Sequence, residues 1–404
     1  MSSGAALEPA VAVRYRRAII AGQALAGLGI GATITMGSLL ASRIGGSEGW
    51  AGLAAAMSTL GSAIAAIPLA RVAARRGRRV SLVTGALIAA AGAMTIMLAG
   101  GLGSIPVLTV GLAAVGVGSA VNLQARFAVT DVSTPERRAR DLSIVVWATT
   151  AGAILGPNLN AVGEIVGGTI GLPTDTGPFL FTTIAQLAAA SMYWFGIPGG
   201  IVAGNSVRPA RGGVVTAPSP RVAALAIAVI AFAHVTMVAV MSITPVHLVH
   251  EGHDLAYAGF VVSLHVAGMY AFAPVFGFLA DRIGRIATMA LGEAVLLGSL
   301  LLTGLMPMDA TAVTLGLFLL GLGWSAVTVA GATLMSENAP ADRRTLFQGR
   351  SDTVQSASGA LAAVAAGPVM AAFTYAGLSL ATIIVVASGS LLLVIARLVR
   401  SRAR

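Results

Sequence analysis

Long apolar runs dominate this 404-residue chain, and twelve of them are roughly 17 to 25 residues long. A helix needs about 20 such residues to cross the hydrocarbon core of a bilayer. The runs are continuously apolar rather than alternating, and only a helix satisfies its own backbone hydrogen bonds within one segment in lipid. The sequence therefore predicts an all-α integral membrane protein with twelve transmembrane helices. The runs cover residues 18–40, 50–70, 80–100, 107–123, 142–162, 179–202, 222–246, 256–279, 286–305, 310–334, 353–373 and 378–398.

The distribution of charge predicts how the chain is oriented in the membrane. Only 10% of residues are charged, against roughly a quarter in soluble domains, which excludes a soluble fold. The net charge of +10 comes from arginines in the tails and in alternate short loops, with only Arg43 on the opposite side. Such a pattern follows the positive-inside rule rather than indicating a nucleic-acid partner. We expect a multi-pass protein of the bacterial inner membrane with both termini in the cytoplasm.

A polar stretch rich in glycine and proline divides the chain nearly in half. It covers residues 204–220 and reads GNSVRPARGGVVTAPSP, a composition typical of linkers. We expect a cytoplasmic linker at this point, between an N-terminal six-helix bundle at 1–203 and a C-terminal six-helix bundle at 221–404.

Internal repetition supports the division into two similar halves. The loop at residues 70–79 aligns with the loop at residues 277–286, an offset of 207 residues. The loops that begin at Pro135 and Pro340 match at almost the same offset. Paired features in two membrane halves are typical of a duplicated transporter, so the two bundles should be pseudo-symmetric.

Across its whole length the chain resembles the major facilitator superfamily of transporters. The signature of that family is Gly-x-x-x-Asp-Arg-x-Gly-Arg after the second helix, often repeated after the eighth. The second copy is present here as Gly277, Asp281, Arg282, Gly284 and Arg285, whereas the first copy has Ala70 and Ala74 in place of glycine and aspartate. The resemblance implies a gating role for the second copy, in which Asp281 contacts an opposing helix N-terminus. The alternative interpretation is an ordinary tight, basic turn.

Soft metal-ligand side chains gather in the second half, where all five histidines lie between His234 and His265. At about 100° per residue, His234, Met237 and Met241 fall within roughly 60° of one helix face, and His265 and Met269 within about 40°. Counted from the short outer loop, Met237 and His265 each lie about 14 Å deep, so they are level.

This combination of donors suits a cuprous ion, which thioether and imidazole ligands hold well, and does not suit magnesium or calcium, which prefer oxygen. Because the chain has no cysteine, thiolate ligands are excluded. Methionine is also an ordinary filler of helix interfaces, so either motif alone is a weak signal. Histidine at mid-membrane depth usually faces a cavity and has a function.

The two motifs together, Met-x-x-x-Met and then His-x-x-x-Met 28 residues later, resemble the CcoA-like copper importers, a branch of the major facilitator superfamily. The stretch from Asn122 to Arg126 also looks like that branch. In that branch these motifs carry the metal, which implies a metal site made of Met237, Met241, His265 and Met269. Relatives in the same branch are thought to move riboflavin, so the branch alone does not fix the substrate.

The sequence therefore predicts a secondary transporter, not an enzyme, that imports copper by alternating access of the two bundles. Copper is the substrate and no cofactor is expected; the partners are the lipid bilayer and, as a candidate, a copper chaperone, and the protein should be a monomer. The first alternative is a carrier of a small organic solute such as riboflavin. The second is a membrane metal sensor or assembly factor that does not transport.

Two further features are open to more than one interpretation. The outer loop holds His247, His250 and His253, which together with His234 form a set of accessory metal ligands or are merely solvated. Glu293, midway along the ninth predicted helix, is an acid within the membrane and a candidate for proton coupling. Because the ninth helix is usually peripheral in this family, the resemblance favours a structural partner for this glutamate or a kink that faces the cytoplasm.

Overall fold

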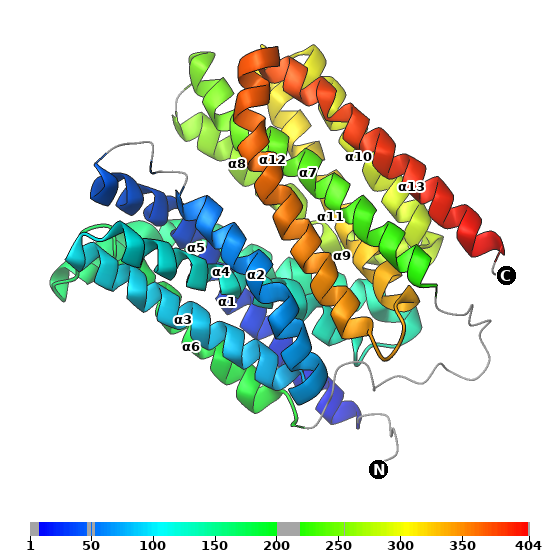
Figure 1. Ribbon diagram of the computed structural model, residues 1–404, viewed down its shortest axis with the longest axis horizontal. Helices are drawn as coiled ribbons and strands as arrows, with labels where there is room; N and C mark the ends of the chain where they lie inside the picture. The colour runs from blue at the N-terminus through cyan, green and yellow to red at the C-terminus, as the bar shows by residue number, and fades with distance from the viewer. Residues whose placement is uncertain (1–7, 47–49, 51–52, 200–218, 254, 403–404) are drawn as a thin grey trace. The chain divides into compact units, whose positions relative to one another are not determined.

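A computed structural model describes residues 8–46, 50, 53–199, 219–253 and 255–402, and these residues are almost entirely helical (Figure 1). In chain order the α-helices are α1 (Pro9–Gly45), α2 (Leu53–Arg76), α3 (Arg78–Leu102), α4 (Ile105–Thr130), α5 (Arg138–Thr169), α6 (Pro178–Gly196), α7 (Pro220–His250), α8 (Leu255–Tyr270), α9 (Ala273–Ile283), α10 (Arg285–Leu305), α11 (Ala310–Asn338), α12 (Arg344–Ala381) and α13 (Ile383–Arg402). A short 3-10 helix, η2 (Pro135–Arg137), precedes α5. Each of the twelve apolar runs overlaps one or two of these helices, which confirms the all-α prediction.

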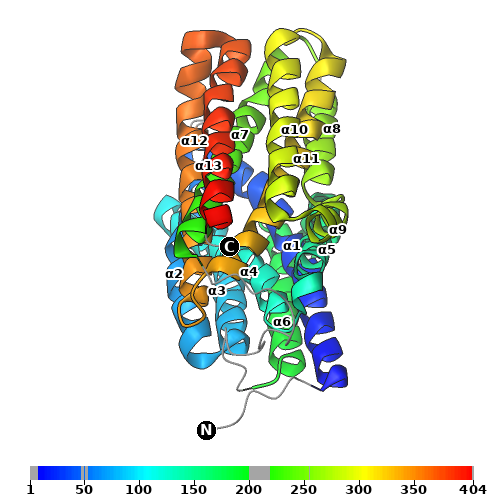
Figure 2. The same cartoon turned by 90° about the vertical axis from the view of Figure 1, so that its right-hand side faces the viewer.

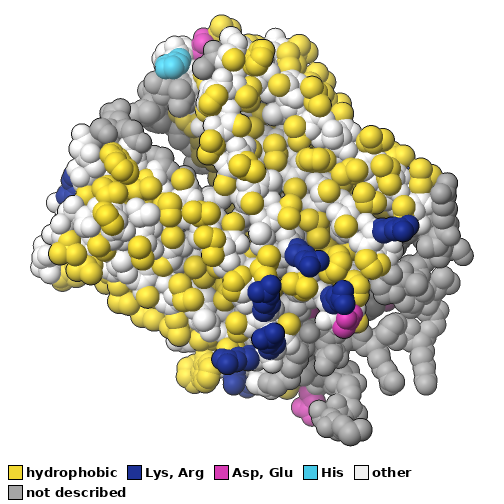
Figure 3. Space-filling view, in the orientation of Figure 1, with side chains coloured by type: hydrophobic (Ala, Val, Ile, Leu, Met, Phe, Trp, Pro, Cys, Tyr) yellow, Lys and Arg dark blue, Asp and Glu magenta, His cyan; other side chains and the backbone are white. Residues whose placement is uncertain are grey.

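Eight helices in the described part of the chain are long and apolar enough to cross a membrane. Apolar side chains also cover much of the surface that the space-filling view in Figure 3 shows. Phe195, Val364 and Ile384, for example, are each more than 70% exposed. Water would disfavour an apolar surface of this extent, whereas acyl chains accommodate it.

One predicted helix is interrupted where the sequence suggested continuity. The run at 256–279 forms two helices, α8 and α9, because Pro274 lies in the first turn of α9 and lacks the N–H group that a continuous helix would use. A break inside α12 is at the predicted place, since Thr374, with a non-helical φ of 64°, lies between the eleventh predicted run and the twelfth.

The chain divides into two compact units whose bounds depart from a simple cut at mid-chain. Unit 1 consists of Met1–Ser133, Ala148–Arg208 and Asp342–Ser356, and unit 2 of Thr134–Trp147, Pro209–Ala341 and Ala357–Arg404. The first part of α5 thus belongs to unit 2, and the first part of α12 belongs to unit 1. Most of the predicted linker at 204–220 lies outside the described residues.

In unit 1 small residues bring helices into close contact. A side chain at Gly61 on α2 would collide with the backbone of Ala113 on α4, and one at Gly116 on α4 would collide with the backbone of Ser58 on α2. Glycines at such crossings let backbones approach, which is how helices associate in lipid. The apolar core beside this crossing includes Leu112 from α4.

In unit 2 helix α11 lies at the centre and packs against α7, α8, α9 and α10 (Figure 2). Glycines again mark the closest approaches. A Cβ at Gly268 on α8 would lie 2.7 Å from the carbonyl oxygen of Phe318 on α11. A Cβ at Gly292 on α10 would lie 2.9 Å from the carbonyl oxygen of Gly323 on α11. Since α11 packs against both α7 and α8, it supports the two helices that carry the predicted metal ligands.

Candidate functional site

The soft donors of α7 lie beside an aromatic cluster. His234 accepts a hydrogen bond at Nδ1 from the indole Nε1 of Trp324 on α11, at 2.9 Å. A Cβ at Gly359 on α12 would lie 2.7 Å from His234 Nε2, so the imidazole is held between two helices. Tyr270, at the end of α8, meets the Trp324 ring edge to face with 6.0 Å between centroids. Three helices thus contribute aromatic rings to one cluster.

On the same helix, Met237 is buried and Met241 is partly buried. Because Nδ1 of His234 already accepts from Trp324, a metal bound by His234 would have to use Nε2. His234 is therefore positioned primarily as a partner of Trp324.

Both predicted metal ligands on α8 are buried. His265 is fully buried, and its Nδ1 donates a hydrogen bond of 2.8 Å to the carbonyl oxygen of Leu317 on α11. This bond places the ring proton on Nδ1 and leaves a lone pair on Nε2. Among the described residues, Nε2 is buried and has no hydrogen-bond partner. Met269, one turn further along α8, is also buried.

Both motif helices use α11 as their main support, and they also contact each other. A side chain at Gly321 on α11 would collide with the carbonyl oxygen of His265, and its Cβ would lie 2.9 Å from the backbone nitrogen of Met269. The His-x-x-x-Met motif is therefore pressed against α11. Convergence of Met237, Met241, His265 and Met269 on a single ion stays a prediction.

Within the described residues no three histidine, aspartate or glutamate side chains come together in a group that could hold a metal ion. A metal site built from the predicted motifs would therefore rely on thioether ligands beside imidazole.

The predicted accessory histidines lie in different surroundings. His247 is buried, stacks on Tyr375 with ring centroids 4.1 Å apart, and has its Nε2 2.8 Å from the carbonyl oxygen of Pro307. His250 is exposed, and His253 lies against the ring of Tyr257. His247 thus joins α7 to α12, and the accessory metal role of these residues stays a prediction.

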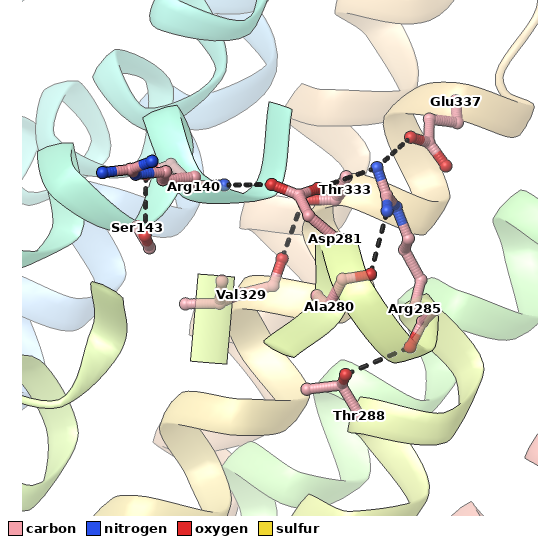
Figure 4. A network of polar contacts seen from close by, with 10 residues as sticks. Arg140, Ser143, Ala280, Asp281, Arg285, Thr288, Val329, Thr333 and Glu337 are labelled. Carbon is pink, nitrogen blue, oxygen red and sulfur yellow. Dashed lines mark hydrogen bonds and ion pairs between the residues drawn. The ribbon is translucent and has the colours of Figure 1, made fainter. Parts of the chain in front are cut away.

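The second copy of the loop signature forms a connected polar network (Figure 4). Oδ2 of Asp281 accepts a hydrogen bond of 3.1 Å from the backbone N–H of Arg140, which lies in the first turn of α5. Arg285 forms ion pairs with Asp281 at 3.0 Å and with Glu337 at 2.9 Å, and donates to the carbonyl oxygen of Ala280. A carboxylate placed at a positive helix end is a favourable electrostatic arrangement.

The glycines of this copy have separate structural tasks. A side chain at Gly277 would collide with Ser143 on α5, so the glycine permits close packing there. Gly284 has φ of 97°, a conformation that other residues rarely adopt, and it ends α9. Arg282 points to the ring of Phe278 instead of joining the network, with 5.8 Å from its Cζ to the ring centroid.

The first copy, in which Ala74 replaces the signature aspartate, contains a buried ion pair that the sequence did not indicate. Arg78 donates from Nε to Asp131 at 2.8 Å, and both side chains are only 1% exposed. Arg78 also donates at 2.5 Å to Gln348, which lies in the part of α12 that belongs to unit 1.

A second buried pair in unit 1 joins α4 to the same part of α12. Arg126 donates to Asp352 at 2.8 Å and to Gln355 at 3.1 Å. The sequence had drawn attention to Arg126 only through its resemblance to one branch. The sequence offered no such signal for Asp352, because this residue lies in a polar stretch just before the predicted run at 353–373.

Comparison with known proteins decides the family. The profile described as Major Facilitator Superfamily matches residues 19–363 and 224–403. The chain belongs to the major facilitator superfamily. It is 35% identical over 376 residues to an MFS-type transporter, YddS, of Bacillus subtilis (strain 168), which covers 90% of this chain and 86% of that protein.

This superfamily member is also 27% identical to the riboflavin transporter RfnT of Brucella anthropi, over 83% of this chain and 84% of that protein. Among solved structures, the human organic anion transporter MFSD10 superposes with a TM-score of 0.73 at 14% identity, covering 96% of this chain and all of that one. The fold prediction is therefore confirmed, and the protein is a multi-pass secondary transporter rather than an enzyme. These matches leave the copper branch a prediction.

Proposed function

We propose that this superfamily member imports copper(I) by alternating access, with Met237, Met241, His265 and Met269 as ligands of the transported ion. The observation that carries the proposal is the state of His265. Its Nδ1 donates to the carbonyl oxygen of Leu317, and its Nε2 lone pair is buried without a partner among the described residues. A histidine oriented by a backbone carbonyl, with the other nitrogen available, is the usual arrangement of a metal-binding imidazole.

The energetics favour a ligand at this nitrogen. A buried polar atom without a hydrogen bond costs about 1–3 kcal/mol, and an ion bound at Nε2 would remove that cost. The buried methionines on α7 and α8 add thioethers, which hold a cuprous ion less tightly than thiolates. Release of the ion on the opposite side therefore remains feasible. On this proposal copper passes from Met241 to the level of Met237 and His265, and leaves past Met269.

The test is uptake of radioactive copper by cells that express the full chain, compared with an empty control. We expect His265→Ala and Met237→Ala each to abolish the saturable component of uptake. The matched control is Met308→Ala, which removes an exposed methionine outside the predicted site and should retain wild-type uptake. Equal uptake by H265A and wild type would overturn the copper proposal.

Copper content of the purified protein separates transport from mere sensing. A membrane metal sensor would bind copper in a manner sensitive to H265A but would give no uptake above the empty control. A transporter shows both.

A second candidate substrate is a flat organic solute such as riboflavin. The observation that favours it is the aromatic cluster of His234, Trp324 and Tyr270, which offers ring faces and edges to a planar molecule. The similarity to a named riboflavin transporter points the same way. Under this alternative, Trp324→Ala abolishes riboflavin uptake and His265→Ala has little effect, so the two variants discriminate the two substrates.

A further inference from the structure

Glu293 is a carboxyl group in the middle of a helix that lipid surrounds. It lies eight residues from Arg285 and twelve from Leu305, which are the ends of α10, so it is about 12 Å and 18 Å from them. The side chain is 2% exposed. At this depth a glutamate is too short to place its carboxyl group in water at either helix end.

Among the residues that the structure describes, the carboxyl group has no hydrogen-bond partner. Neither Oε1 nor Oε2 accepts or donates a hydrogen bond to any described residue. Helices α9, α11 and α13 pack against α10, and their charged residues lie near helix ends. These residues are Asp281 and Arg282 on α9, Asp309 and Glu337 at the two ends of α11, and Arg397, Arg400 and Arg402 on α13.

The one charged residue on α10 besides Glu293 is Arg285, and it is already paired with Asp281 and Glu337. The predicted structural partner of Glu293 is therefore not found among the described residues.

Gly389 on α13 provides the space that the carboxyl group occupies. A Cβ at this position would lie 2.9 Å from Oε1 and 3.2 Å from Oε2 of Glu293. Any larger residue at position 389 would displace the carboxyl group. Gly389 thus forms a notch on α13 that fits the carboxyl group of Glu293. This fit in shape indicates that the burial of Glu293 is specific.

A bare carboxylate in such a place is far more costly than a neutral acid, because nothing compensates for its lost hydration. We propose that Glu293 is a proton-binding site, in which the packing of α10 against α13 at Gly389 requires the protonated acid. Release of the proton leaves a carboxylate that needs water, so deprotonation and loosening of the α10–α13 contact are linked. A transporter with such a site can exchange protons with water as its helices move. The inference does not depend on copper being the substrate.

Infrared spectroscopy of the purified full chain tests the protonation directly. The difference spectrum between wild type and Glu293→Gln at neutral pH should contain the carbonyl band of a protonated carboxylic acid, and this band should shift in heavy water. Glu136→Gln removes an exposed carboxylate and should give no such band. A wild-type spectrum in which Glu293 contributes only carboxylate bands would overturn the proposal.

The linkage to packing has its own measurement, the melting temperature as a function of pH. The folded state holds a proton on Glu293 that the unfolded chain releases at neutral pH, so stability should fall as pH rises. Glu293→Gln, which is permanently neutral, should show a weaker decline than wild type over the same range. Identical pH profiles would contradict the linkage.

A pair of glycine variants tests the notch. Gly389→Ala should weaken the infrared band of the buried acid or move it, because the methyl group displaces the carboxyl. Gly298→Ala on α10 is the matched control, since a Cβ there meets no neighbouring atom within 4 Å. If G389A leaves the band unchanged, the notch does not hold the acid.

Failure of copper uptake by wild type would overturn the proposed substrate alone, because none of these three measurements uses copper.

Discussion

The two copies of the loop signature, one in each unit, are related by the internal repeat but are built from different chemistry. Arg78 in unit 1 and Arg285 in unit 2 are 207 residues apart and occupy equivalent positions. Each donates to a carboxylate at the C-terminal end of a long helix, Asp131 directly after α4 and Glu337 in the last turn of α11. The arginine–carboxylate pair is therefore common to both copies, although only the second matches the signature in sequence.

In both copies the helix that precedes the loop packs tightly against a neighbouring helix. The glycine that permits this contact is on the preceding helix in one copy and on the neighbouring helix in the other. In unit 2, Gly277 leaves space for Ser143. In unit 1 the glycine is on the other side of the contact, because a Cβ at Gly349 would lie 2.5 Å from the side chain of Ala70. Sterically the two arrangements are equivalent.

The difference lies in what secures each copy to its neighbouring helix. In unit 2, Asp281 accepts the N–H of Arg140, and the pair of Arg285 with Glu337 is partly exposed. In unit 1, Ala74 cannot accept a hydrogen bond through its side chain, but the Arg78 pair is almost completely buried. Loss of the signature aspartate is thus accompanied by deeper burial of the remaining ion pair.

The largest expected effect comes from breaking the buried pair of unit 1. Asp131→Ala leaves the buried Arg78 without its carboxylate, and such a change costs about 3–5 kcal/mol. Glu337→Ala in unit 2 removes a partly exposed partner and should cost about 1 kcal/mol or less. Thermal unfolding of the purified variants measures both. Equal losses would show that burial does not distinguish the two copies.

The second pair of unit 1 sharpens the comparison, since unit 2 has no described counterpart of it. Asp352→Ala should also cost about 3–5 kcal/mol, towards the lower end because Gln355 still accepts from Arg126. Replacing both partners, in Arg126→Met with Asp352→Leu, should restore most of that stability, because apolar side chains fill the space without a buried charge. A double variant as unstable as D352A would contradict this account.

The exchanged glycine allows one copy to be converted into the arrangement of the other. Gly277→Ala should cost about 1–3 kcal/mol because its methyl group meets Ser143. Adding Ser143→Gly reproduces the alanine and glycine pair of unit 1 and should recover the part of the loss that is due to Ser143, while the contact at 2.7 Å with the carbonyl oxygen of Ala139 remains. The melting temperatures of the single and double variants provide the measurement, and no recovery would mean that the two contacts are not equivalent.

The smallest effect concerns the aspartate that only one copy has. Asp281→Asn should cost about 1 kcal/mol, because a neutral amide interacts weakly with the N-terminus of α5. Introducing the missing carboxylate with Ala74→Asp should stabilise unit 1 by a few tenths of a kcal/mol up to about 1 kcal/mol. Unfolding of each variant at low and high salt gives the result, since added salt should reduce both effects.

The helices could be predicted from the sequence because lipid leaves a spanning chain little choice of structure. A run of apolar residues such as 80–100 is long enough to cross, and it lies within α3 as expected. The interruption at Pro274 could have been predicted as well, since proline removes an N–H group. Thr374, by contrast, carries no residue-type signal for its positive φ.

The candidate site was predictable only in its residue types and their periodicity. The spacing of His265 and Met269 is visible in the sequence, but the carbonyl of Leu317 that fixes the imidazole tautomer is not, because every residue has a carbonyl. Ion pairs such as Arg126 with Asp352 join positions 226 residues apart, and no local pattern relates them. Likewise, that Glu293 has no hydrogen-bond partner among the described residues depends on how α9, α11 and α13 pack against α10, which the sequence does not reveal.

The division of α5 and α12 between the two units has a consequence for any attempt to dissect the protein. Cutting the chain in the 204–220 segment would leave residues 342–356 on the C-terminal fragment, although they complete unit 1, and residues 134–147 on the N-terminal fragment, although they complete unit 2. The N-terminal fragment alone would leave Arg126 without Asp352, and the C-terminal fragment alone would leave Asp281 without the N–H group of Arg140. Co-production of both pieces should rescue what neither piece achieves in isolation.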